Sequence, residues 1–301
     1  MNDFDQAARF AVRMDPMNFM RWLVPDLPPT ILFRQWLDTR TVPFPGEGDR
    51  TCDTVVEFID IAQPGVAYAM PIEFQSQPDP NMLDRLLEYL ARLRRELRYG
   101  PRRQHKYQVI SALVNLTGAV QPNILEMQMP GGSSVGLRFQ TVVRTMREED
   151  AAATLEAIEA GAIGLCMLPW IPLMRGAGKR GMIEQWKAAA SKEKDSRLRT
   201  TYAGIAVVFA DLDGRGRLWR KELEMWNMGE SSIANEWRNE GRAEEKKKNL
   251  LRVLELRFPK KLPSDVVTTV EAESNATKLD AWLDAAVMAA SPDEFRAAIG
   301  G

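Results

Sequence analysis

Apolar residues recur at helical spacing at the start of the chain. Phe4, Ala8 and Ala11 would fall on one face of a helix. Pro16 interrupts this pattern, and further apolar residues then continue it toward Pro25. Residues 3–24 are therefore predicted to form two short helices.

Prolines and glycines dominate the next segment, and the spacing of the apolar residues then changes. Residues 25–50, which end in PFPGEGDR, are predicted to form a turn-rich loop. Residues 52–61 and 66–75 are rich in β-branched and aromatic residues, and the Gln-Pro-Gly sequence between them is typical of a turn. These two segments predict a β-hairpin. Pro71 has no N–H to donate within a sheet, so we expect it at a sheet edge or at a bulge.

A strongly amphipathic segment follows the predicted hairpin. Asp79 and Pro80 give a helix start signal, and leucines recur on one side of residues 81–98. These leucines are Leu83, Leu86, Leu87, Leu90 and Leu93. Residues 107–116 predict a third strand, and residues 135–143 predict a further one.

Helical patterns dominate from residue 146 onward. The segment EEDAAATLEAIEAG predicts a helix that ends at Gly161. Further helices are predicted over residues 183–190, 200–209, 230–258, 263–272, 276–289 and the segment that follows Ser291-Pro292-Asp293. Because the strands stop near residue 145, we divide the chain into an α/β core over residues 1–145 and a helical region over residues 146–301. The helical region is a candidate for interaction or oligomerisation.

The composition excludes several classes of protein. Lys and Arg number 40 against 41 Asp and Glu, for a net charge of -1, so any nucleic-acid contact needs a local basic patch. Two cysteines, Cys52 and Cys166, indicate a reducing compartment and no disulfide framework. The one histidine, His105, cannot build a zinc finger with them. It also has no carboxylate beside it, which argues against a Ser-His-Asp mechanism.

No segment of the chain predicts export or membrane insertion. The N-terminal sequence MNDFDQAARF carries acidic residues early and lacks the apolar core of a signal peptide. The apolar stretch at residues 162–174 is too short to cross a bilayer, and Pro169 and Pro172 break it. We therefore expect a cytoplasmic protein without a membrane partner.

Asp53, Glu73 and Gln75 form the candidate chemical centre, within residues 50–120. Residues at i and i+2 of a strand project to the same side, so Glu73 and Gln75 point together. Asp53, at the start of the partner strand, can point into the same space. Magnesium prefers oxygen ligands, commonly one or two carboxylates with water and substrate phosphates. The pattern predicts a Mg²⁺ or Mn²⁺ site with Asp53 and Glu73 as metal ligands and Gln75 as the third catalytic residue.

The segment MPIEFQSQPDPNMLDRLLEYLARL resembles the core signature of the Rpn-type recombination-promoting nucleases. This family also carries the name transposase and belongs to the PD-(D/E)XK nuclease superfamily. The segments WLVPDLP, NLTG and EGRAEEKKKNLLRVLELRFPKKLP are similar to the same family. The resemblance implies an α/β fold with a PD-(D/E)XK restriction-endonuclease-like core, in which helices flank a mixed sheet. It implies DNA breakage linked to recombination, mobile elements or defence.

The resemblance also implies roles for particular residues. Asp53 matches the first acid of the family pattern, and Glu73 with Gln75 matches the element on the next strand. Arg85 and Tyr89 match an Arg and a Tyr of the family's helix, which implies a place beside the metal ligands or against a phosphate. The superfamily usually has a lysine where Gln75 stands. A lysine ammonium stabilises negative charge, whereas a glutamine amide brings hydrogen bonds but no charge, so low turnover is an open alternative.

Basic residues cluster at the end of the predicted helix over residues 81–98 and in the loop after it. They are Arg92, Arg94, Arg95, Arg98, Arg102, Arg103 and Lys106. Such a cluster can bind phosphates and position a nucleic acid over the metal. The alternative is a solvated helix end, where cations are also favoured by the helix dipole.

Together these observations predict a metal-dependent DNA endonuclease that acts on double-stranded DNA. A homodimer is compatible with this activity. Two alternatives stay open. The first is a nucleic-acid-binding module with little or no catalysis, which the glutamine at position 75 motivates. The second is an interaction or oligomerisation protein on a nuclease scaffold, which the helical region motivates.

Overall fold

The computed structural model describes most of the chain as two compact units. The described residues are 3–37, 54–99, 106–118, 121–129, 136–223, 226, 246–247, 249–258, 262–273, 275–289 and 291–299. One unit is formed by Phe4–Met228, and the other by Met1–Asp3 with Gly229–Gly301. The change from strands to helices near residue 145 lies within the larger unit.

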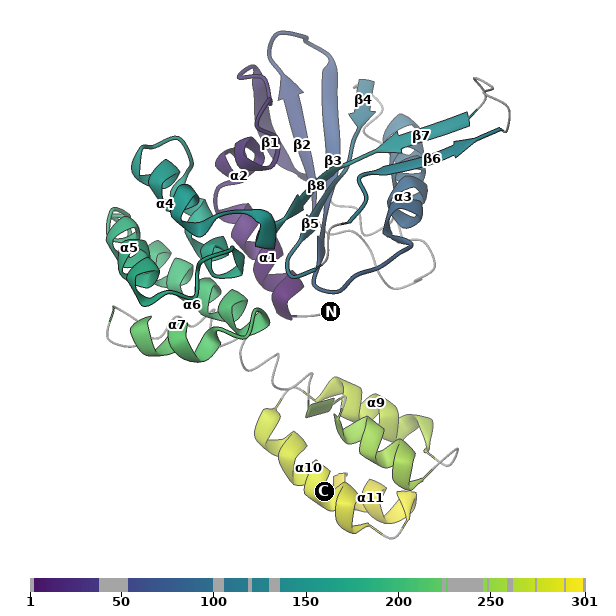
Figure 1. Cartoon of the computed structure of the whole chain (residues 1–301). Coiled ribbons are helices and arrows are strands. Elements are labelled where there is room, and N and C mark those ends of the chain that lie inside the picture. Colours follow the sequence, from purple (N-terminus) through teal and green to yellow (C-terminus); the bar gives the residue numbers. More distant parts are fainter. Residues whose placement is uncertain are drawn as a thin grey trace. The chain divides into compact units, whose positions relative to one another are not determined.

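A mixed sheet forms the centre of the larger unit (Figure 1). Its strands are β1 (Ile31–Leu37), β2 (Val55–Asp60), β3 (Val66–Gln75), β4 (Lys106–Val109), β5 (Ala112–Asn115) and β8 (Val142–Thr145). The order is β1-β2-β3-β5-β8, and β4 pairs with the first half of β3 beside β5. β1, β2 and β3 are antiparallel neighbours, whereas β4 and β5 run parallel to β3 and β8 runs parallel to β5. The expectation of an α/β fold with a mixed sheet flanked by helices is confirmed.

The predicted hairpin is present, but Pro71 lies elsewhere than expected. β2 and β3 pair with Val55 opposite Pro71, and β3 is a central strand of the sheet, so the expected edge position is wrong. Ile72 N–H donates to the carbonyl of Thr54 on the β2 side, so the nitrogen of Pro71 faces the opposite neighbour. On that side, β3 pairs with β4 up to Ala69 and with β5 from Ile72 onward. No hydrogen bond between strands therefore requires an N–H at position 71.

Two strands lie outside the predicted set. β1 falls in the segment predicted as loop, because its prolines flank the strand and do not interrupt it. β6 (Ile124–Gln128) pairs with β7 (Gly136–Gln140) in a separate antiparallel ribbon, and β7 and β8 replace the single strand predicted over 135–143. Both β6 and β7 expose most of their residues, so they lack the apolar run that marks a buried strand.

Helix α3 (Met82–Tyr99) covers one face of the sheet, as Figure 1 shows. It confirms the helix predicted over residues 81–98. Tyr89 and Leu93 of α3 pack against Ala69 of β3, so the odd-numbered side chains of β3 face this helix. The β6–β7 ribbon packs on the same helix through Leu125 and Phe139.

An aromatic core fills the opposite face of the sheet. α1 (Asp3–Met14) and α2 (Pro16–Leu23) confirm the two helices predicted at the start of the chain, with Asp15 as the N-cap of α2. Trp170 lies in the 3-10 segment η2 (Leu165–Leu173), and its ring centroid is 5.2 Å from that of Phe19, 5.9 Å from that of Phe74 and 4.9 Å from that of Phe209. These contacts join helices from both halves of the larger unit to the even-numbered side chains of β3.

The helices after β8 complete the larger unit. They are the short segment η1 (Met146–Glu148), α4 (Ala151–Glu159), α5 (Arg180–Ala190), α6 (Ser196–Leu212) and α7 (Gly216–Leu223). α4 ends as predicted, with Gly161 at a φ of 74° after its C-cap, where a side chain would strain the backbone. α7 is an addition to the predicted helices.

The smaller unit is helical. It contains helical residues 249–257, α9 (Ser264–Ala272), α10 (Ala276–Met288) and α11 (Pro292–Ile299). Leu254, Val270 and Trp282 are members of its own apolar core, which explains why it forms a separate unit. Most of the helix predicted over residues 230–258 lies outside the described residues. In the described part of the chain, no helix combines the length and apolarity that crossing a membrane requires.

Candidate functional site

Glu73 lies in the central strand, on the face that α3 covers. It follows Ala69 by four residues in a regularly paired strand, so its side chain points to the same face as Ala69. Only 6% of Glu73 is exposed. A carboxylate is costly to bury, so a buried one implies hydrogen-bonding or charged partners around it. Glu73 therefore places a charged oxygen group, with its partners, on the face that α3 covers.

Gln75 shares this face at the carboxyl end of β3. It is 5% exposed, and neither its amide oxygen nor its amide nitrogen makes a hydrogen bond with the described residues. Its neighbours across the sheet are Asn115 of β5 and, beyond it, Thr145 of β8, both buried. Leaving a buried amide without partners costs about 1–3 kcal/mol. Such a group is therefore a sign of a site whose partner is a ligand, an ion or water.

Asp53, the other predicted metal ligand, lies outside the described residues. The strand that follows it is well placed, since Val55 pairs with Pro71 beside Glu73. Within the described ranges, no three His, Cys, Asp or Glu side chains come together in a way that could hold a metal. The described part of the chain therefore brings together Glu73 and Gln75 but not a complete set of ligands.

The two predicted helix residues differ in their surroundings. Arg85 is partly buried and forms an ion pair with Asp79, with 2.6 Å between Nη1 and Oδ2. Asp79 also accepts a hydrogen bond from Asn81 N–H, so it fixes the start of α3 and the Arg85 side chain together. Tyr89 is fully buried in the cluster that joins α3 to Ala69. Both lie on the face of the sheet that carries Glu73.

The basic cluster lies at the end of α3 and the start of β4. Arg94, Arg95 and Arg98 are exposed on α3, and Lys106 is exposed at the first position of β4. Arg92 pairs with Glu88 one turn before it, which neutralises part of the cluster. The guanidinium of Arg98 lies over the Tyr99 ring, 5.5 Å from its centroid. Arg102 and Arg103 lie outside the described residues.

Glu57 is a buried carboxylate that sequence reasoning missed. It lies on β2 opposite Ala69, on the same sheet face as Glu73, and has no solvent exposure. Its Oε1 accepts a hydrogen bond from the Tyr107 hydroxyl at 2.8 Å, and its Oε2 accepts one from the Gln35 amide at 2.5 Å. Arg34 Nη1 lies 3.3 Å from Oε1. An acidic residue inside the apolar run CDTVVEFIDI was the available signal.

Cys166, the cysteine among the described residues, is not a reactive group. Burial raises the pKa of the Cys166 thiol to about 12. The thiolate is the reactive form, so this residue is inert near neutral pH. Cys52 and His105 lie outside the described residues.

The oxygen ligands that the structure describes at this site fit a hard divalent cation. The buried carboxylate of Glu73 and the unpartnered amide oxygen of Gln75 are oxygen donors on one face of one strand. No family model matches the chain, and neither a curated protein nor a solved structure shows significant similarity to it.

Proposed function

We propose that the chain is a divalent-metal-dependent DNA endonuclease with a PD-(D/E)XK-type site. The observation that carries this proposal is the pair Glu73 and Gln75, buried on one face of the central strand, with the Gln75 amide unpartnered among the described residues. The order of β2, β3 and α3 agrees with the order of elements that the family resemblance implies. A role in recombination, mobile elements or defence rests on that resemblance alone.

Glu73 and Asp53 are the proposed metal ligands. Val55 and Pro71 are paired in neighbouring antiparallel strands. Asp53 comes two residues before Val55, and Glu73 comes two residues after Pro71. This equal spacing is why we pair Asp53 with Glu73. A bound Mg²⁺ or Mn²⁺ would supply Lewis acidity toward the scissile phosphate and a more acidic bound water. Gln75 orients that water through its amide or completes the ligand shell through its oxygen.

Arg85 and Tyr89 have supporting roles in this proposal. Arg85, held by Asp79, is the candidate to contact a phosphate at the start of α3. Tyr89 is fully buried, so it positions its neighbours and does not meet the nucleic acid. The nucleic-acid-binding residues are Arg94, Arg95, Arg98, Arg102, Arg103 and Lys106. Of these, the exposed arginines of α3 provide a phosphate-binding surface on a chain whose net charge is only -1.

Cleavage of supercoiled plasmid tests the proposal. Wild type, Asp53→Ala, Glu73→Ala and a Glu159→Ala control are incubated with Mg²⁺, Mn²⁺ or EDTA, and nicked and linear products are measured. Glu159 is exposed on α4, away from β3 and α3 in the sequence, so its loss leaves the proposed site and the basic cluster intact. Cutting by wild type and the control, but not by the two site variants or with EDTA, is the expected result. Equal cutting by Glu73→Ala would refute the assignment.

A nucleic-acid-binding module without catalysis is the second candidate, and Gln75 favours it. A glutamine cannot supply the positive charge of the superfamily's usual lysine, so the chemical step could be lost while the basic surface remains. Such a module binds DNA in EDTA and never cuts it. Cleavage by the wild type separates the cases, because an endonuclease cuts when Mg²⁺ is added, whereas cutting that appears only in Gln75→Lys would show that the glutamine has abolished the chemical step.

The smaller unit motivates the third candidate, a protein that associates with itself or with a partner. It exposes Leu256, Val287 and Met288, and Arg257 Nη1 donates to the carbonyl of Ala286 at 2.6 Å. This hydrogen bond joins the Arg257 side chain to α10 near these exposed residues. The mass in solution distinguishes a monomer from a homodimer, and a homodimer is compatible with an endonuclease that cuts two strands. We place the protein in the cytoplasm, in keeping with its cysteine content.

A further inference from the structure

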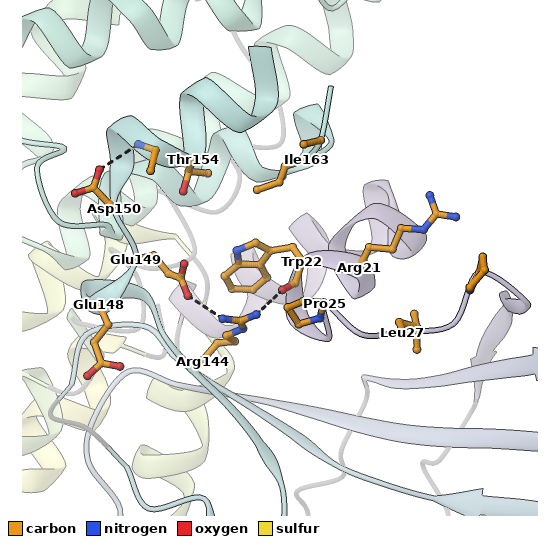
Figure 2. Close-up of a pocket in the computed structure, with 13 residues that line it drawn as sticks. Arg21, Trp22, Pro25, Leu27, Arg144, Glu148, Glu149, Asp150, Thr154 and Ile163 are labelled. Atoms are coloured by element: carbon orange, nitrogen blue, oxygen red, sulfur yellow. Dashed lines mark hydrogen bonds and ion pairs between the residues drawn. The ribbon is translucent and has the colours of Figure 1, made fainter. Parts of the chain in front are cut away.

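A cavity of about 740 Å³ opens on the other side of the sheet from Glu73. Figure 2 shows it between α2, the loop after α2 and the start of α4. Arg144 of β8 lies in its wall and pairs with Val114, which pairs with Phe74 on the aromatic face of β3. The cavity is therefore separate from the proposed metal site, and its volume falls within the range typical of ligand pockets.

Two polar groups in the cavity wall have no hydrogen-bond partner among the described residues. Trp22 is 7% exposed and Thr154 is 6% exposed, and both line the cavity. Neither the indole N–H nor the threonine hydroxyl makes a hydrogen bond with the described residues. In Figure 2 the indole lies between Arg144 and Thr154. Both polar atoms are open to the cavity, because neither is among the fully enclosed, unpartnered side-chain atoms of the described residues, so each can bond to a ligand group there.

Arg144 holds the indole in place and is itself occupied. Its Nη2 donates to the carbonyl of Trp22 at 2.9 Å and its Nε donates to the carbonyl of Leu23 at 3.3 Å, while its guanidinium lies 5.5 Å from the Trp22 ring centroid. Its Nη1 lies 3.4 Å from Oε1 of Glu149. The N–H groups of Arg144 thus already have acceptors in this wall, so they are not available to bind an anion.

Three carboxylates lie beside Arg144 in the cavity wall. Glu148, Glu149 and Asp150 follow one another at the edge of the cavity. Asp150 caps α4 through the N–H groups of Ala152 and Ala153 and pairs with Arg175. Glu148 is exposed and makes no ion pair with the described residues, and Oε2 of Glu149 has no partner among them. The side of the cavity that carries Glu148 and Glu149 therefore favours a cation, whereas Arg21 lies on the other side of Trp22.

The rest of the wall is apolar apart from Arg21, which is exposed and lies on the opposite side of Trp22 from Glu149 in Figure 2. Pro25, Leu27 and Pro29 come from the loop after α2, and Ile163 lies just beyond α4. A ligand that satisfies all three features has a cationic group, an apolar stem and a hydrogen-bond acceptor. A basic residue within a peptide has each of them, because its backbone carbonyl can accept from the Trp22 indole while its charged end meets the carboxylates.

We propose that this cavity binds an arginine or lysine side chain of a peptide segment, flanked by apolar residues. The backbone carbonyl of that segment accepts a hydrogen bond from Trp22, the stem of the basic side chain lies on the Pro25 and Leu27 wall, and its cation pairs with Glu148 and Glu149. The proposal is independent of the nuclease function, since none of these residues belongs to the proposed metal site.

Isothermal titration calorimetry of the full chain tests it with three probes. They are acetyl-Leu-Arg-Leu-amide, acetyl-Leu-Glu-Leu-amide and the single residue acetyl-arginine-methylamide. The arginine peptide is expected to bind at least about tenfold more tightly than the glutamate peptide. Equal binding of the two peptides, or no binding of the arginine peptide up to millimolar concentration, would overturn the proposal. Equal affinity for the single residue would overturn the assignment to a peptide.

Variants then locate the site. Glu148→Gln combined with Glu149→Gln should weaken binding of the arginine peptide by about tenfold, and Ala162→Trp, at the exposed edge of the cavity, should block it. Glu156→Gln is the matched control, because it removes a charge from an exposed position of α4 that does not line the cavity. Thermal unfolding confirms that each variant is folded. Unchanged binding in both site variants would place the peptide elsewhere.

Discussion

Two buried polar residues on one face of the sheet contrast with each other. Glu57, on β2, has no exposed surface, and its carboxylate accepts hydrogen bonds from Tyr107 and Gln35 beside Arg34. Gln75, at the carboxyl end of β3, is nearly as buried, yet its amide makes no hydrogen bond with the described residues.

The difference separates a structural group from a candidate functional one. A buried carboxylate with several donors is stabilised by the fold that surrounds it. An unsatisfied buried amide destabilises the fold, and such local costs concentrate at functional sites. We therefore expect substitutions at Glu57 to lower stability and leave activity unchanged, and substitutions at Glu73 and Gln75 to lower activity.

The largest expected effect is that of Glu73→Gln on catalysis. This change keeps the shape of the side chain and removes the charge that holds the metal. Loss of outer-shell partners of a metal site costs roughly 10–100-fold, so loss of a charged ligand should lower the rate of plasmid cleavage by more than about 100-fold. The rate at saturating Mg²⁺ measures it. A rate equal to that of wild type would contradict the difference between the two residues, because Glu73 would then have a structural role like that of Glu57.

Glu57→Ala should have the largest effect on stability. Breaking a fully buried charge pair costs about 3–5 kcal/mol, and the guanidinium of Arg34 keeps some access to solvent, so about 2–3 kcal/mol is expected here. That loss lowers the melting temperature by about 4–12 °C. Calorimetry measures it, and cleavage per folded molecule should match wild type. An unchanged melting temperature would show that the buried carboxylate contributes nothing.

Tyr107→Phe sharpens the same side of the comparison. It removes the hydroxyl that donates to Glu57 at 2.8 Å and leaves the ring in place. A hydrogen bond to a charged group contributes about 1.5–3 kcal/mol, and the lower end is expected because Gln35 and Arg34 remain. Urea unfolding measures the change. In combination with Glu57→Ala the two losses should not add, since they remove one interaction. Full additivity would contradict the shared network.

The smallest effect, and one of opposite sign, is expected for Gln75→Met. Methionine has a similar length and no amide, so the unsatisfied group disappears and the free energy of unfolding should rise by about 1 kcal/mol. Cleavage should fall at the same time, because the water or metal loses its amide partner. Urea unfolding and the plasmid assay are run on the same preparation. A loss of stability would mean that the amide is already satisfied in the native chain.

Much of the candidate site followed from the sequence. The hairpin of β2 and β3 and the helix α3 were predicted within a few residues, so Glu73 and Gln75 were placed on one strand face correctly. Their burial was not predicted, nor was Glu57, whose partner Tyr107 is 50 residues away. Contacts at such separation leave no periodic trace in the sequence.

The sequence by itself determined the elements whose signal is local. α1, α2, α3 and the helices of the smaller unit follow from apolar spacing and capping residues, because a helix bonds to itself and shows its buried side at a fixed period. The tertiary structure alone decided the rest. β1 forms a strand because β2 supplies its hydrogen bonds, and Pro71 is tolerated centrally because the pairing changes from β4 to β5 beside it. The cavity exists only because Trp22, Arg144 and Thr154 meet there.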